Sequence, residues 1–177
     1  MTRPVLVLGA NGMLGHKVVQ VAAPTLDVYA TVRRAEPGLS SLLGIPDDHL
    51  LPDVDITAPL EPLFAQVRPD VVVNCVGALK PVAGRLDPVE AIAVNALAPR
   101  RLASAASACG ARLIHVSTDC VFAGRRGHYR EEDPPDATDL YGRSKALGEV
   151  TDDGHLTIRT SIVGRQLRGA RGLIRPG

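Results

Sequence analysis

The chain opens with a short apolar run at residues 4–8, followed by a glycine-rich turn and then by apolar positions at helical spacing from Leu14 to Ala22. Comparable short apolar runs recur at residues 28–32, 50–54, 70–75, 112–116 and 155–159. Short apolar runs bounded by polar or turn residues predict buried strands. Strands that alternate with helical segments predict an α/β fold, here a doubly wound parallel sheet (Rossmann fold) with helices on both faces.

Helical spacing of apolar residues also marks residues 59–67 and 88–109. Pro99 lies inside the second of these segments. Because proline has no N–H to donate to the preceding turn, we expect a kink or a local break there.

The turn Gly9-Ala-Asn-Gly-Met-Leu-Gly15 follows the first strand directly. Gly9 permits a tight turn, Gly12 lets the backbone approach a pyrophosphate, and Gly15 lets the helix pack on the strand. A strand, a glycine turn and a helix N-terminus together present N–H groups to a phosphate. The spacing differs from the G-x-G-x-x-G of many dehydrogenases, and a turn of purely structural value is the alternative.

Tyr141 and Lys145 stand four residues apart, so on a helix they share one face. An ammonium beside a phenol favours the phenolate, so we expect Lys145 to lower the pKa of Tyr141 toward neutral pH. Two solvated side chains are the alternative, because this spacing is common on exposed helices.

Two hydroxyls, Ser117 and Thr118, follow the strand at residues 112–116. In an open parallel sheet that is the carboxyl edge, where ligands bind. We expect Thr118 to reach the same cleft as Tyr141, with Ser117 as the competitor and simple turn capping as the alternative.

Composition indicates one soluble domain. The chain has 177 residues, 45% hydrophobic content and a formal charge of +1, which favours neither a nucleic-acid nor a membrane partner. No apolar signal core or spanning stretch is visible, so we expect a cytoplasmic protein. Three cysteines without a C-x-x-C pair favour reduced thiols, and five scattered histidines predict no metal site.

Five motifs in order resemble the extended short-chain dehydrogenases/reductases, and within them the dTDP-4-dehydrorhamnose reductase group of nucleotide-sugar reductases. The resemblance runs from residue 3 to about residue 165. The motifs are the glycine turn, Val73-Asn-Cys-Val-Gly77, Ser117-Thr-Asp-Cys-Val-Phe-Ala-Gly124, Glu132-Asp-Pro-Pro135 and Tyr141-Gly-Arg-Ser-Lys145.

This resemblance implies a reductase of the 4-keto group of a nucleotide-linked deoxy sugar. Thr118, Tyr141 and Lys145 match the catalytic residues: Thr118 would bond the carbonyl, Tyr141 would protonate it, and Lys145 would bond the ribose of the cofactor. Tyr141 and Lys145 are thus implied as cofactor contacts too. The other implied cofactor contacts are Gly9, Asn11, Gly12, Met13, Leu14 and Gly15 for the pyrophosphate, Asp55 and Ile56 for the adenine, and Asn74, Val76 and Gly77 on the nicotinamide side.

The second strand ends in Arg33 and Arg34, where an acidic residue would bond the ribose 2′-hydroxyl of NAD. Arginine suits the 2′-phosphate of NADP, so we expect NADP(H). NAD(H) stays possible because Glu36 is close by.

The C-terminal part departs from the family pattern, since the resembling enzymes continue into a lobe that grips the nucleotide-sugar. We expect an NAD(P)-binding domain at residues 1–165 and a basic, flexible tail at 166–177 that lacks most of that lobe. A homo- or hetero-oligomer could complete the pocket. The alternatives are an inactive dinucleotide-binding accessory or regulatory subunit, a truncated remnant, and a nucleotide-sugar epimerase or dehydratase.

Overall fold

The computed structural model describes residues 3–79, 86–152 and 154–167. Its centre is a six-stranded sheet with the strand order β3-β2-β1-β4-β5-β6, in which every pair of neighbours is parallel. The strands are β1 (Pro4–Leu8), β2 (Asp27–Thr31), β3 (Leu50–Leu51), β4 (Val71–Asn74), β5 (Arg112–Ser117) and β6 (Leu156–Arg159). The order reverses between β1 and β4, which confirms the predicted doubly wound sheet.

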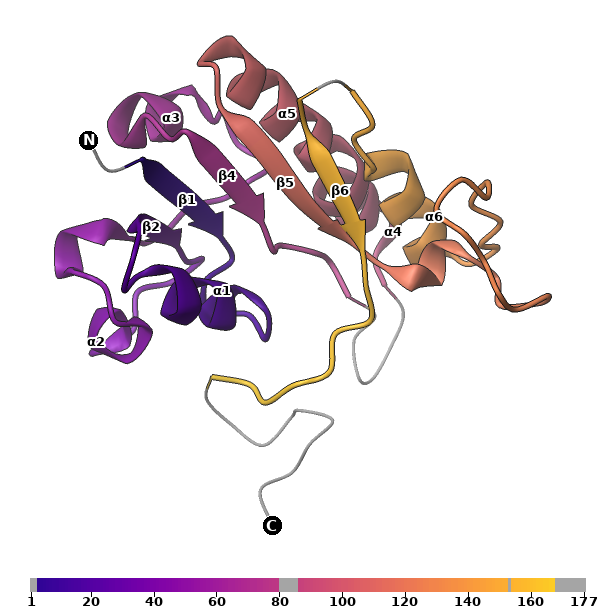
Figure 1. The fold of residues 1–177 in the computed structure, drawn as a ribbon, viewed down its shortest axis with the longest axis horizontal. Coiled ribbons are helices and arrows are strands. Elements are labelled where there is room, and N and C mark those ends of the chain that lie inside the picture. The colour runs from indigo at the N-terminus through magenta and orange to yellow at the C-terminus, as the bar shows by residue number, and fades with distance from the viewer. Residues whose placement is uncertain (1–2, 80–85, 153, 168–177) are drawn as a thin grey trace.

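Helices cover both faces of the sheet (Figure 1). One face carries α1 (Gly15–Ala22) and α2 (Leu39–Leu43), and the other carries α3 (Glu61–Val67), α4 (Pro88–Ala91), α5 (Ala98–Ala108) and α6 (Leu140–Gly148). Two 3-10 segments, Asp47–His49 and Asp119–Val121, precede β3 and follow β5.

The core is split by the sheet into two buried clusters, and β1 contributes to both. Leu6 and Leu8 pack with the side chains of α3 and α5, whereas Val5 and Val7 pack with those of α1 and α2. Successive residues of a strand point to opposite faces, so a strand buried on both sides must be apolar at every position. This is why the run at residues 4–8 shows no polar alternation.

The third strand is shorter than the predicted run of residues 50–54. Leu51 O still accepts a bond from Val32 N at 3.0 Å, but Asp53 adopts a left-handed φ of 59°, and Val54 N is the group that donates to Val32 O, at 3.2 Å. Helix α2 was not predicted. Its five residues lie between Gly38 and Gly44, which both have positive φ, and so short a helix has no periodic signal.

A kink or local break was expected at Pro99. The structure has a π-helical segment, Ile92–Leu97, between α4 and α5, which ends two residues before Pro99, and Pro99 lies in the first turn of α5. Helix α3 begins at Glu61, two residues later than predicted.

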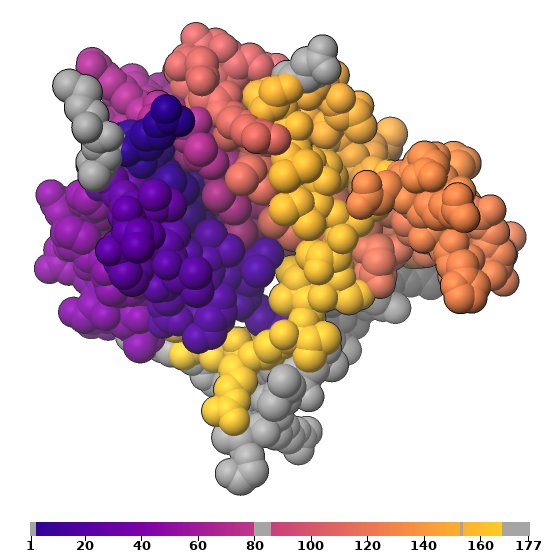
Figure 2. All heavy atoms as spheres, in the orientation of Figure 1, coloured from indigo at the N-terminus to yellow at the C-terminus, as the bar shows by residue number. Residues whose placement is uncertain are grey.

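After β6 the chain turns back toward α1 (Figure 1), and its atoms lie next to those of the first part of the chain in the space-filling view (Figure 2). A Cβ on Gly164 would lie 3.9 Å from Cγ of Met13, and Leu167 packs against the cluster beneath α1 and α2. Most of the tail predicted at 166–177 lies outside the described residues. Within the described part, no helix combines the length and apolarity needed to cross a membrane.

Candidate active site

A cavity of about 300 Å³ lies at the carboxyl ends of the strands in the first half of the sheet. Eight of the predicted cofactor residues line it, namely Gly9, Asn11, Gly12, Arg33, Asp55, Ile56, Val76 and Gly77. They come from the segments that follow β1, β2, β3 and β4. The parallel topology therefore gathers at one edge residues that are up to 68 positions apart, from Gly9 to Gly77.

The glycine turn has the shape that its spacing predicts. Gly9 has a φ of 80°, and a Cβ on it would lie 2.9 Å from the side chain of Val76. A Cβ on Gly15 would overlap the carbonyl oxygen of Gly9, so only glycine lets α1 start this close to the strand. A Cβ on Gly12 would meet only that same oxygen, at 3.1 Å, so the turn leaves bare backbone beside the cavity. Such a cradle fits a pyrophosphate.

Other predicted cofactor residues lie outside the cavity lining. Leu14 caps α1, Met13 precedes it beside Gly164, and Arg34 is exposed next to Arg33. Asn74 is fully buried: its Oδ1 accepts a bond from Val76 N at 3.1 Å and its Nδ2 lies 3.1 Å from Nδ1 of His115. Asn74 therefore shapes the cavity wall through the backbone of Val76.

Asp55 is oriented by its neighbour. Both the backbone N–H and the hydroxyl of Thr57 donate to Oδ1 of Asp55, at 2.8 and 2.7 Å. These bonds lower the pKa of Asp55, and the charge of Arg33 lowers it further. A fixed carboxylate and a guanidinium thus stand together in the cavity.

Sequence reasoning missed five lining residues: Thr31, Val32, Val54, Cys75 and Val94. Four of them lie at or just after the carboxyl ends of predicted strands, and that position was the available signal. Val94 lies in the π-helical segment, and no sequence pattern indicated its place.

Tyr141 stands at the start of α6, opposite the segment that follows β5. Asp139 caps the helix by accepting a bond from Gly142 N at 3.0 Å, and Thr118 caps the 3-10 segment by accepting one from Cys120 N at 3.2 Å. Thr118 is thus both a turn cap and a neighbour of the Tyr141 phenol, with which its side chain has a hydrogen-bonding interaction.

Ser117 is directed elsewhere. Its hydroxyl is buried and donates to Oε1 of Glu149 at 2.9 Å. Of the two hydroxyls left open by the sequence, Thr118 is therefore the one beside Tyr141.

The predicted effect of Lys145 on Tyr141 is wrong for this structure. Burial raises the pKa of Tyr141, the interaction with Thr118 opposes that rise, and Cys120, Asp119 and Asp139 add to it. Burial of the phenol is the largest cause of the shift, and the Lys145 ammonium donates to Val116 O of β5 at 2.8 Å.

Burial also acts on the groups around Lys145. It lowers the pKa of Lys145 to about 8, which Glu149 and Cys75 oppose. It raises the pKa of the Cys75 thiol to about 12 and lowers the pKa of His115 to about 3, the Lys145 charge contributing to the latter. Cys75 and His115 are therefore neutral at physiological pH.

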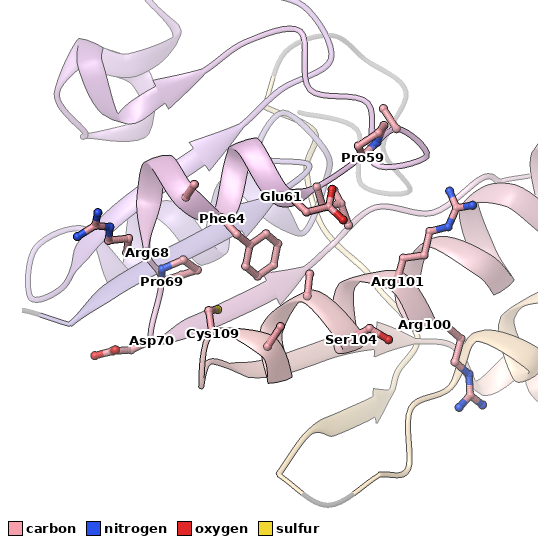
Figure 3. A pocket seen from close by; sticks show the side chains of 15 residues that line it. Pro59, Glu61, Phe64, Arg68, Pro69, Asp70, Arg100, Arg101, Ser104 and Cys109 are labelled. Atoms are coloured by element: carbon pink, nitrogen blue, oxygen red, sulfur yellow. The ribbon is translucent and has the colours of Figure 1, made fainter.

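A larger cavity, of about 970 Å³, lies between α3 and α5 (Figure 3). Figure 3 shows the ring of Phe64 projecting from α3 into this space, with Arg68 and Asp70 at one end and Pro59 and Arg101 at the other. The lining contains none of the predicted site residues. Across the described ranges, no group of three or more His, Cys, Asp or Glu side chains could hold a metal ion.

The strand order, the glycine turn at its switch point and the Tyr141–Lys145 helix define a Rossmann-fold protein of the extended short-chain dehydrogenase/reductase type. Comparison with known sequences narrows this class. Residues 2–169 match the RmlD substrate binding domain family, and the chain belongs to it.

Two sequence relatives illustrate the range of that similarity. The dTDP-4-dehydrorhamnose reductase of Streptomyces griseus is 38% identical over 163 residues, which are 88% of this chain and 48% of that protein. Methionine adenosyltransferase 2 subunit beta of Bos taurus is 35% identical over 149 residues, which are 83% of this chain and 42% of that protein. The chain spans about half the length of these relatives.

The chain is also similar in structure to solved proteins of this group. A hypothetical dTDP-4-dehydrorhamnose reductase from Sulfolobus tokodaii superposes with a TM-score of 0.79 at 30% identity, over 92% of this chain and 57% of that one. The dTDP-4-dehydrorhamnose reductase of Bacillus anthracis in complex with NADP gives a TM-score of 0.71 at 27% identity, over 90% of this chain and 53% of that one.

Proposed function

We propose that this chain is the nucleotide-binding part of an NADPH-dependent reductase that acts on the 4-keto group of a nucleotide-linked deoxy sugar. The observation that carries the proposal is the position of Lys145. Its Nζ would lie 4.0 Å from a Cβ on Gly77, and Gly77 lines the cavity that begins at the glycine turn. Lys145 therefore lies beside the wall of the cavity that Gly77 forms.

The cavity residues fit a dinucleotide. Gly9, Gly12 and the start of α1 would hold the pyrophosphate, and Asp55 with Ile56 would border the adenine. Arg33 lines the same cavity, which suits a 2′-phosphate and supports NADPH over NADH. The complex of the Bacillus anthracis relative with NADP supports the same preference.

Tyr141, Thr118 and Lys145 would each have a separate role in the reaction. Tyr141 keeps its proton at neutral pH, because its pKa is raised, and it would donate that proton to the carbonyl oxygen of the sugar. Thr118, next to the phenol, would orient the carbonyl, and Lys145 would bond the ribose hydroxyls. A bound reduced nicotinamide supplies the hydride.

Tyr141→Phe tests the proposal. Turnover of a dTDP-linked 4-keto-6-deoxy sugar with NADPH should fall by about 100-fold or more, because the acid is lost, while NADPH affinity stays within about twofold. Tyr129→Phe is the matched control, since Tyr129 is a half-buried tyrosine whose hydroxyl donates to Asp136. Full turnover in the Tyr141 variant would remove Tyr141 as the acid.

A second function has support of its own, a dinucleotide-binding subunit without turnover. The methionine adenosyltransferase 2 subunit beta relatives favour it, since they are named as a subunit. NADPH binding at micromolar concentrations, combined with no turnover by the parent chain alone, would favour this function. Turnover that appears only when a second protein completes the sugar pocket would favour the reductase.

A further inference from the structure

Glu149 is a buried carboxylate directly after α6, and neither the glycine turn nor the tyrosine motif accounts for it. Only 5% of it is exposed. A buried carboxylate is costly unless it is paired and fully hydrogen-bonded. Its partners therefore indicate why it is there.

Three bonds hold the carboxylate of Glu149. Arg159, at the end of β6, donates to it twice, from Nε to Oε1 at 2.8 Å and from Nη2 to Oε2 at 2.7 Å. The hydroxyl of Ser117, at the end of β5, donates to Oε1 at 2.9 Å. Ser117 and Arg159 are register partners in the sheet, so Glu149 joins α6 to the ends of two neighbouring strands.

Lys145 makes the companion contact one helical turn earlier. Its Nζ donates to Val116 O, and Val116 immediately precedes Ser117 in β5. Lys145 and Glu149, four positions apart, thus bind Val116 and Ser117, which are consecutive in β5. Thr118 comes next in the chain, so the same clamp fixes the point where β5 enters the candidate active site.

The groups that face Lys145 come from three elements. Cys75 follows β4 and His115 belongs to β5, and both are neutral at physiological pH. Glu149 is the charged group among them. Its own partner, Arg159, is exposed on one side and stacks over the ring of Phe122, with its Cζ 5.0 Å from the ring centroid.

We infer that Glu149 is a positioning residue for the candidate active site: its bonds to Ser117 and Arg159 fix the carboxyl end of β5, where Val116 O accepts the bond from Lys145 and Thr118 follows. This inference rests on the proposed function, because the proposed function assigns Lys145 and Thr118 their roles in the reaction. A purely structural carboxylate would stabilise the fold without acting on the ionisation of Lys145.

The test is the titration of Lys145 in the free chain. The sequence has three lysines, Lys17, Lys80 and Lys145, so lysine labelled with carbon-13 at Cε gives three NMR signals, and Lys145→Arg identifies one of them. The midpoint of Lys145 in the parent chain is expected at about pH 8. Glu149→Gln should move it to lower pH by about one unit or more, because a buried opposite charge is lost. Glu90→Gln, at an exposed carboxylate on α4, should leave it unchanged.

A double variant covers the case in which Glu149→Gln fails to fold because Arg159 loses its partner. Glu149→Gln with Arg159→Met removes both charges, and the midpoint should again move to lower pH. An unchanged midpoint in whichever folded variant is measured would overturn the inference. The titration needs no cofactor and no turnover. The proposed function is tested by a different measurement: it would be rejected if the parent chain did not bind NADPH.

Discussion

Gly142 packs against the carbonyl oxygen of Cys120 so closely that a Cβ on residue 142 would overlap that oxygen. The contact joins the first turn of α6 to the 3-10 segment after β5. Tyr141 precedes Gly142, and Thr118 lies two residues before Cys120. The glycine in the Y-G-R-S-K motif therefore allows the phenol and the hydroxyl to come together.

Gly142→Ala is expected to push α6 away from that segment. The added methyl has rigid neighbours, the Cys120 carbonyl and the Ala137 side chain, so we expect a loss of about 1–3 kcal/mol in the free energy of unfolding. Urea denaturation measures it. Leu147→Ala, at an exposed position of the same helix, is the control and should change stability far less. Equal stability of the parent and the Gly142 variant would contradict the packing argument.

Arg33→Ala should weaken NADPH binding about tenfold or more and leave NADH binding nearly unchanged. A bond from a charged donor is worth about 1.5–3 kcal/mol, and only NADPH carries the phosphate that would receive it. Arg34→Ala is the matched control, because Arg34 is exposed and is not among the cavity residues. Fluorescence titration with both nucleotides measures the difference, and an equal loss for both would reject the 2′-phosphate role.

Stability should depend on pH through Lys145. Its pKa is about 8 when folded, against 10.5 for the ordinary side chain, so between these values the unfolded chain binds more protons. The free energy of unfolding therefore rises with pH in this window, by about 3 kcal/mol in total, and the penalty is fully present below about pH 8.

The difference between the parent and Lys145→Met isolates this effect, because other titrating groups cancel. Stability of the parent relative to the variant should climb from about pH 8 to about pH 10.5 and then level off. Lys17→Met, at an exposed lysine, should give a flat difference. A flat difference for Lys145→Met as well would mean that Lys145 is solvated.

Asn95 should be important both for stability and for the cavity. It is fully buried in the π-helical segment and forms two bonds with the backbone of Ala78, at 2.8 and 3.0 Å, and one with Ser144, at 3.1 Å. Asn95→Leu leaves the Ala78 groups unsatisfied, so we expect a loss of roughly 3 kcal/mol and weaker NADPH binding through the adjacent Gly77. Ser144→Ala removes one bond only and should cost less. Thermal unfolding and calorimetric titration measure the two effects.

The parts of the site that depend on local chemistry could be predicted from the amino-acid sequence. The glycine turn needs its residues at fixed offsets, and the strand ends that line the cavity were predicted within two residues, apart from β3. That strand ends early because the left-handed backbone at Asp53 interrupts its extended conformation.

What the sequence could not give was the environment of each charge. The spacing of Tyr141 and Lys145 correctly places both on one helix, yet the direction of the pKa of Tyr141 depends on burial and on Thr118, Asp119 and Cys120, which lie some twenty positions earlier. The partners of Glu149 likewise come from β5 and β6.

Periodicity and turn chemistry act over a few residues, so the strand and helix alternation, the glycine turn and the helix that carries Tyr141 and Lys145 could be read from the chain. The hydroxyl beside the phenol, the carboxylate near Lys145 and the lining of the cavity became known only from the folded structure. Desolvation and Coulomb forces act through space, so their sign at a given residue is fixed only when the sheet brings distant segments together.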